Sequence, residues 1–346
     1  MSGVDLSTRY LGMPLRNPLV ASASPLSASI DTLLRLEEAG AAAVVLPSLF
    51  EEQIVHDELE VHRLLNLGAD SQPEASDYFP QLEDYNTGPA GYLRHLERAK
   101  GALSIPVIAS LNGSTPGGWL RYAGLLQDAG ADAIELNVYT VAAGPEVSGR
   151  AIEHELLELV AAVRVAVAVP IAVKCSPFFT SMAHMAVELV GAGADGLVLF
   201  NRFVQPEIDL ESMAVVSRVH LSSPEEIRLT LRWIALLRDH LRASLAATSG
   251  IHTAADIVKV LLAGADVAMM ASVLLANGPE YLGFLLAELT AWLAEHEYTS
   301  VRQLQASMSQ RAAQDPSAFE RVQYMKALTS FSPPDAPAGP TPGSAG

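Results

Sequence analysis

The chain has 346 residues, half of them hydrophobic, so it can bury the core of one large domain or of two ordinary ones. Its net charge of −17 argues against a nucleic acid or an anionic membrane as the main partner. The single cysteine, Cys175, excludes an internal disulfide framework and a thiolate zinc cluster. The sequence shows no basic-then-apolar leader and no apolar run long enough to span a bilayer, so we expect a cytoplasmic protein.

Four segments share one pattern, in which a helix end is followed by a glycine and then by an apolar run too short to be another helix. They are Leu36–Leu46, Leu126–Asn137, Leu189–Asn201 and Leu261–Ser272. The glycine suits the left-handed residue that follows a helix. The continuous apolar run suits a strand buried on both faces of a parallel sheet. This recurrence predicts an α/β fold of the (β/α)8 TIM-barrel type.

In chain order, eight strands are predicted, at Pro18–Ser24, Ala42–Ser48, Pro106–Asn112, Ala133–Tyr139, Pro170–Ser176, Gly196–Arg202, Ser244–Gly250 and Val267–Ser272. Segments with helical periodicity separate most of them. The helices expected are Trp119–Ala129, Glu153–Val167, Met182–Ala192, Pro224–Leu241, Ala254–Leu262 and Pro279–Glu295.

Two insertions interrupt the repeat, Glu51–Lys100 after the second strand and Phe203–Ser223 after the sixth. Both leave the C-terminal ends of strands, so we expect them to arch over the barrel mouth as lids or substrate walls. Decoration or a subunit interface is the alternative, and a homodimer is expected. Ser300–Thr329 is expected to add C-terminal helices outside the barrel, within one domain that covers residues 1–329.

The last residues, Ser330–Gly346, contain five prolines and no apolar pattern, so a disordered tail is expected. Removing this tail should leave the melting temperature unchanged, because a disordered segment contributes no packing to the fold. Thermal unfolding of the truncated chain beside the full chain checks this, and a large drop would show that the tail is packed.

Polar side chains end most of the predicted strands, where a barrel interior otherwise favours Val, Ile and Leu. Lys174 is the most informative, because an ammonium inside the apolar segment AVKC is costly to bury without a partner. Three roles stay open for it: an ion pair with Glu135 on the neighbouring strand, a contact with an anion or cofactor, or a Schiff-base nucleophile. Cys175 should point the opposite way and is not assigned as a base.

The ends of the seventh and eighth strands form a second signal. Thr248-Ser249-Gly250 precedes a helix, and Ala271-Ser272 closes the eighth strand. In (β/α) barrels the loops after these two strands commonly hold a phosphate on backbone N–H groups, and a glycine lets the backbone approach the phosphate closely. We therefore predict a phosphate site here. The histidines and carboxylates show no ligand spacing, so no metal is expected.

Several motifs in this order resemble the dihydroorotate dehydrogenase family of FMN-dependent barrels, and in particular its bacterial dihydroorotate dehydrogenase-like members. They include PLVASASPLS, PVIASLNG, GADAIELNVY, PIAVKCSPFF and GADGLVLFNRFVQPEID, within about Leu6–Pro279. The resemblance implies a bound FMN at the barrel mouth and a place in pyrimidine biosynthesis. It also implies cofactor contacts from Ala21, Ser22, Asn112, Asn137, Lys174, Asn201, Ser249, Gly250, Ala271 and Ser272.

The chain departs from the family on the substrate side. The family places a cysteine or serine base after the fourth-strand asparagine, and Thr140 stands at that position here. Pro47 replaces a second lysine, and Ala142 replaces an asparagine that binds the orotate carboxylate region. The cofactor half of the site thus matches the family and the substrate half is altered.

These residues predict a flavin-dependent dehydrogenase or oxidase that acts on CH–CH groups. A hydride would pass to flavin N5 from dihydroorotate or a related small anionic substrate, with an electron acceptor that the sequence does not name. Thr140, or else Tyr139, would remove the accompanying proton. The predicted catalytic residues are thus Thr140 and Lys174. Asn137 and Asn201 would orient the substrate, and Arg202 would either bind its carboxylate or form a surface salt bridge. The alternatives are a Schiff-base lyase or aldolase, and a non-catalytic flavin-binding partner subunit.

Overall fold

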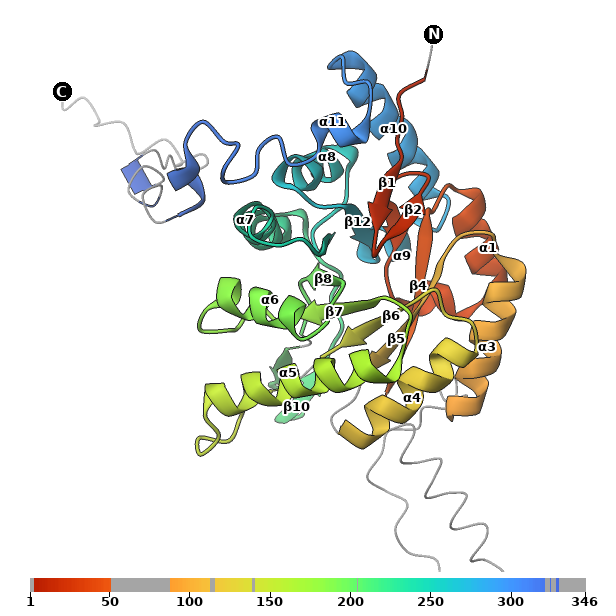
Figure 1. The fold of residues 1–346 in the computed structure, drawn as a ribbon, viewed down its shortest axis with the longest axis vertical. Helices are drawn as coiled ribbons and strands as arrows, with labels where there is room; N and C mark the ends of the chain where they lie inside the picture. Colours follow the sequence, from red (N-terminus) through yellow and green to blue (C-terminus); the bar gives the residue numbers. More distant parts are fainter. Residues whose placement is uncertain are drawn as a thin grey trace, which may run out of the picture.

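The computed structural model describes residues 3–50, 88–112, 116–138, 141–203 and 205–320, with residues 324, 328 and 329. Eight parallel strands close into a barrel in the order β11-β12-β3-β4-β5-β6-β7-β8 (Figure 1). The strands are β3 Leu19–Ala21, β4 Ala43–Phe50, β5 Val107–Asn112, β6 Ala133–Asn137, β7 Ile171–Cys175, β8 Gly196–Leu199, β11 Ser244–Thr248 and β12 Val267–Met270. The predicted TIM barrel and its eight strands are confirmed.

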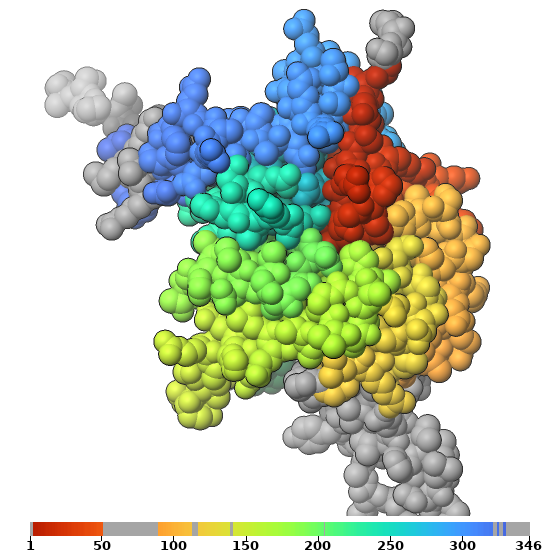
Figure 2. Space-filling view, in the orientation of Figure 1, coloured from red at the N-terminus to blue at the C-terminus, as the bar shows by residue number. Residues whose placement is uncertain are grey.

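Helices separate the strands and cover the outside of the barrel. They are α1 Ile30–Glu38, α3 Gly88–Ala102, α4 Pro116–Asp128, α5 Gly149–Ala166, α6 Met182–Gly191, α7 Ile227–Leu237, α8 Ala254–Ala263, the short α9 Ser272–Asn277 and α10 Tyr281–Glu295. On the face shown in Figure 2, the orange, yellow and green parts of the chain follow one another around the molecule in chain order. No described helix has both the length and the apolar composition of a bilayer span.

The glycines of the four repeated segments stop the helices as the sequence predicts. Gly40, Gly130, Gly193 and Gly264 all have positive φ angles, between 93° and 123°. The backbone N–H of Gly264, for example, donates to the carbonyls of Val260 and Leu261 and so closes α8. A glycine adopts this conformation without the steric cost that a side chain would add. The chain can therefore turn directly from each helix into the next buried strand.

Two apolar layers hold the fold together. The larger one lies between the strands and the helices, and the smaller one fills the barrel interior with residues such as Val20, Ile108 and Met269. A hairpin of β1 Thr8–Tyr10 and β2 Met13–Leu15 adds Tyr10 and Leu15 to the interior layer. Alternate residues of each strand face the two layers, so inward-facing side chains near the strand C-termini reach the barrel mouth.

Of the two predicted insertions, one agrees with the structure and the other was given too wide a range. Phe203–Ser223 leaves the C-terminal end of β8, as predicted, and contains an antiparallel hairpin of β9 Pro206–Asp209 and β10 Ala214–Ser217. The predicted insertion Glu51–Lys100 is too long, because its last part forms α3, the helix that returns the chain from β4 to β5. Residues 51–87 lie outside the described residues.

The prediction of helix over Ser300–Thr329 is confirmed only in part. Within the described residues, α11 Val301–Leu304, the 3-10 turn Pro316–Phe319 and residues 324, 328 and 329 are helical, whereas residues 305–315 are not. The backbone N–H groups of Ala306 and Met308 donate to the carbonyls of Leu261 and Leu262 on α8. These tertiary hydrogen bonds replace the intrahelical ones and hold the segment outside the barrel. Residues 330–346, the expected tail, lie outside the described residues.

Candidate active site

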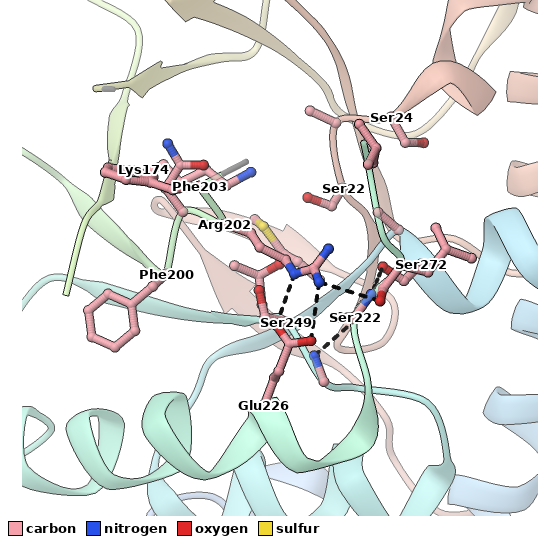
Figure 3. Close-up of a pocket in the computed structure, with 18 of the residues that line it drawn as sticks. Ser22, Ser24, Lys174, Phe200, Arg202, Phe203, Ser222, Glu226, Ser249 and Ser272 are labelled. Carbon is pink, nitrogen blue, oxygen red and sulfur yellow. Dashed lines mark hydrogen bonds and ion pairs between the residues drawn. The ribbon is translucent and has the colours of Figure 1, made fainter. Parts of the chain in front are cut away.

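A cavity of about 780 Å³ opens at the C-terminal ends of the barrel strands, a size typical of small-molecule sites (Figure 3). Its walls come from the ends of the strands, from loop residues such as Phe178 and Phe203, and from residues 218–222. Nine of the residues predicted from the sequence line it: Ser22, Asn137, Lys174, Asn201, Arg202, Ser249, Gly250, Ala271 and Ser272. The barrel topology thus brings together side chains that are as far as 250 positions apart, as from Ser22 to Ser272.

Four predicted residues are not placed there. Ala21 packs in the layer between strands and helices, because it alternates with the inward-facing Val20. Asn112 ends β5 but is not among the residues that line the cavity. Thr140, the expected base, and Tyr139, its alternative, lie outside the described residues.

An amide network forms one end of the cavity. The Nδ2 of Asn201 donates to Oδ1 of Asn137 at 2.6 Å, and Nδ2 of Asn137 donates to Oγ of Ser48 at 3.3 Å. The hydroxyl of Ser48 in turn lies 2.8 Å from the hydroxyl of Ser110. The two asparagine side chains are therefore held in fixed orientations by each other and by Ser48, although these residues come from alternate strands of the barrel, β4, β6 and the end of β8.

Lys174 lies beside this network, because it pairs with Asn137 in the register of β7 against β6. Its Nζ is 3.5 Å from Oε1 of Glu135, which is fully buried. The ion pair considered from the sequence is therefore present. The lysine also lines the cavity, so the same side chain contacts both the buried carboxylate and the site.

The turn after β11 forms another part of the cavity wall. Ser249 and Gly250 have φ angles of +72° and +73°, so two successive residues adopt the left-handed region. For a serine this conformation costs about 1–2 kcal/mol. Ser222 helps to hold the turn, because its Oγ accepts from the Gly250 N–H at 3.4 Å. The Ser222 N–H donates to Oγ of Ser272 at 3.0 Å, and this links the turn to the loop after β12.

Gly250 is required by the packing of the protein itself. A Cβ at this position would lie 2.2 Å from the backbone nitrogen of Ile227, at the start of α7. The sequence interpretation gave another reason for this glycine, the close approach of a phosphate. The contact with α7 explains the absence of a side chain without any ligand.

Arg202 is engaged within the chain. Its Nε donates to Oε2 of Glu226 at 2.9 Å, and its other nitrogens reach the carbonyls of His220 and Leu221 (Figure 3). Glu226 also accepts from the Ser223 N–H at 2.8 Å. Of the two roles left open by the sequence, the salt bridge is the one that the structure shows. Arg202 thereby fastens the end of the Phe203–Ser223 segment to the start of α7.

We expect Arg202→Gln to loosen residues 218–223 without unfolding the barrel. The ion pair is about one third exposed on both sides, so its loss with the two carbonyl contacts should cost about 1 kcal/mol of local opening free energy. Amide hydrogen exchange in this segment should become roughly fivefold faster. Arg218→Gln is the control, because Arg218 pairs with Asp209 at a longer 3.7 Å. Equal exchange in the two variants would contradict the fastening role.

Cys175 faces the helix layer and is 2% exposed. Burial raises the pKa of its thiol to about 12, from an ordinary value of 9.0. Only the thiolate is a good nucleophile, so the native protein should not react with a thiol reagent at pH 8, whereas the urea-unfolded chain should react quickly. Rapid labelling of the folded protein would show that Cys175 is more accessible than this structure allows.

The sequence interpretation missed the apolar side of the cavity. Phe178 and Phe203 meet edge to face, with ring centroids 5.9 Å apart, and Phe200, Leu221 and Leu229 line the same cavity. Most of these residues lie in loops or on the first turns of helices, where no periodic pattern marks them. This side of the cavity offers an apolar surface to a ligand whose polar edge faces the amide network.

Comparison with known proteins places this geometry in a family. Residues 81–293, more than half of the chain, match the family model for dihydroorotate dehydrogenase. The chain belongs to the dihydroorotate dehydrogenase family. It is therefore an oxidoreductase of the class that acts on CH–CH groups, as the sequence motifs indicated.

Relatives within the dihydroorotate dehydrogenase family match most of the chain at low identity. The catalytic subunit of dihydroorotate dehydrogenase B (NAD(+)) from Thermoplasma acidophilum is 25% identical over 312 residues, which cover 87% of this chain and 97% of that protein. The same subunit from Methanosarcina acetivorans is 27% identical over 300 residues, which cover 85% of this chain and 93% of that protein. A putative dihydroorotate dehydrogenase A (fumarate) from Aeropyrum pernix is 28% identical over 58% of this chain and 67% of its own length.

Proposed function

We propose that this protein is an FMN-dependent oxidoreductase that takes a hydride from a small substrate, dihydroorotate or a related acid, at the barrel mouth. The observation that carries the proposal is the arrangement of Lys174, Asn137 and Asn201 around one cavity with the turn at Ser249 and Gly250. Figure 3 shows Lys174 and Ser272 at opposite sides of that cavity, so it has polar groups at both ends. An elongated ligand with a polar ring and a phosphate tail needs such a site.

The residues present fit FMN, which supplies a ring that accepts a hydride. Lys174 would place a positive charge beside the polar edge of the ring, where it stabilises negative charge. Asn137 and Asn201 are already oriented by their mutual hydrogen bond. The backbone around Ser249, Gly250 and Ser272 would hold the phosphate, as loops after the last two strands of such barrels do. Phe200 and Phe203 would exclude water from the apolar side.

The charges of the described residues that line the cavity limit how an anionic substrate can bind. All three of their lysine and arginine side chains already have a carboxylate partner: Lys174 with Glu135, Arg202 with Glu226 and Arg218 with Asp209. Within the described residues, an anionic substrate would therefore depend on neutral donors, the amides above all. Proton removal stays assigned to Thr140 or Tyr139, as proposed from the sequence.

The Schiff-base alternative is less well supported. An ammonium that is ion-paired with a buried carboxylate has no free electron pair to attack a carbonyl. The relatives are also named as dehydrogenases and not as lyases. The same names, which include a catalytic subunit, favour a catalytic protein over an inactive partner.

Anaerobic reduction tests the proposed function directly. The FMN-reconstituted protein is mixed with dihydroorotate, other dihydropyrimidines and related acids, and flavin absorbance is followed. Bleaching by at least one of them is expected, and a Thr140→Ala variant should slow it strongly while it keeps its FMN. A colourless protein that borohydride traps covalently with a carbonyl compound would favour the lyase instead.

A further inference from the structure

Glu135 is a carboxylate in the interior of the barrel. It shares the inner face of β6 with Ala133 and Asn137, while Ile134 and Leu136 face the helices. Its side chain is 0% exposed, and its Oε2 has no hydrogen-bond partner among the described residues. A buried carboxylate with one oxygen unpaired is expensive, and an apolar residue would be simpler to accommodate here. Such a costly group calls for an explanation.

Few polar groups face Glu135. In the strand register it lies between Ser110 on β5 and Ala172 on β7, and the Ser110 hydroxyl is already bonded to Ser48. The Tyr10 hydroxyl at the base of the interior is also buried, with no partner in the part of the chain that the structure describes, and burial together with the charge of Glu135 raises its pKa. Asp266 is the other acidic group near that base, and it pairs with Arg238. Among the described residues, the ion pair that Glu135 forms is the one with Lys174.

The ammonium of Lys174 therefore lies between the Glu135 carboxylate and the cavity. An ammonium has three N–H donors, and Oε1 of Glu135 accepts one of them at 3.5 Å in the barrel interior. Lys174 itself lines the cavity, so the remaining donors are available to a ligand. The carboxylate restricts where the flexible lysine chain can place its charge. It also offsets part of that charge as seen from the cavity.

We propose that Glu135 is a positioning residue, which fixes the Lys174 ammonium at the cavity floor and lowers the reduction potential of the flavin bound above it. The proposal rests on the proposed function, because it takes FMN as the ligand. A bare ammonium beside the ring would stabilise the added negative charge of the reduced cofactor. A neighbouring carboxylate opposes that stabilisation, so it keeps the reduced cofactor the stronger electron donor.

The first test measures the midpoint potential of the flavin in the reconstituted full chain and in Glu135→Gln. The glutamine has nearly the same shape but no charge, so the potential should become more positive. Asp266→Asn is the matched control, because it removes a mostly buried carboxylate whose partner, Arg238, is not among the cavity residues. Its potential should equal that of the wild type. An unchanged or more negative potential in Glu135→Gln would overturn the proposal.

The second test needs no flavin. Trace acetylation of lysines in the apo chain, read out by mass spectrometry, should label Lys174 about tenfold faster in Glu135→Gln, because the charged hydrogen-bond partner that holds its Nζ in the barrel interior is gone. Glu135→Asp keeps the charge, so it should stay close to the wild type in both tests. It also covers the case in which Glu135→Gln fails to fold, since fast labelling in Glu135→Asp would contradict the pairing. If the wild type binds no FMN, the proposed function fails while labelling still decides whether Glu135 controls Lys174.

Discussion

Lys174→Met is expected both to destabilise the fold and to abolish retention of FMN. The methionine removes the cation that faces Glu135, whose side chain is completely buried. Breaking a buried ion pair from one side typically costs about 3–5 kcal/mol, because the remaining charge has no compensation. The same change removes the positive charge at the polar end of the cavity. Urea unfolding gives the loss of stability, and flavin absorbance after reconstitution gives the loss of cofactor.

A double variant separates the two effects of this substitution. In Lys174→Met/Glu135→Gln no charge is left in the pair, so most of the free energy of unfolding should return. FMN retention should not return, because the ligand contact is still missing. If the single variant keeps both the stability and the flavin content of the wild type, neither role of Lys174 is correct.

Gly250→Val is expected to cost about 4 kcal/mol or more, enough to unfold a marginal protein. Two penalties add at this position. The residue has a φ angle of +73°, and a Cβ would meet the backbone nitrogen of Ile227 at 2.2 Å. Backbone atoms cannot move aside as a flexible side chain can, so the turn and the start of α7 must separate. Thermal and urea unfolding measure the effect.

Gly12→Val is the matched control for this prediction. Gly12 has a similar φ of +77°, but nothing lies within 4 Å of the Cβ that it would gain. It should therefore show only the conformational cost, about 2 kcal/mol. If Gly250→Val is no less stable than Gly12→Val and yet loses FMN, the close approach of a phosphate is the better reason for the glycine.

The barrel could be predicted from the sequence because its signals are local. Each buried strand is a continuous apolar run, and Gly40, Gly130, Gly193 and Gly264 mark where the preceding helices stop. Residues at the strand C-termini could be assigned to one site from topology alone, since a closed barrel brings all those ends together. This is why nine predicted residues line the same cavity.

The parts that could not be predicted depend on contacts between distant segments. Arg202 pairs with Glu226, which lies beyond the Phe203–Ser223 segment. The spacing of these residues in the sequence does not indicate whether Arg202 binds this carboxylate or the carboxylate of a substrate. Just after α11, part of the helix expected over Ser300–Thr329 is replaced by backbone hydrogen bonds from Ala306 and Met308 to α8, a tertiary effect that helical propensity does not register. The aromatic wall of Phe178 and Phe203 belongs to loops, whose side chains follow no period.

The most direct measurement is the flavin content of the full chain after reconstitution with FMN and removal of the excess. We expect a yellow protein with about one FMN per chain, and a Lys174→Met variant that is colourless after the same treatment. A well-folded wild-type protein that retains no FMN, or that holds an unrelated ligand at the barrel mouth, would contradict the assignment of this cavity to FMN.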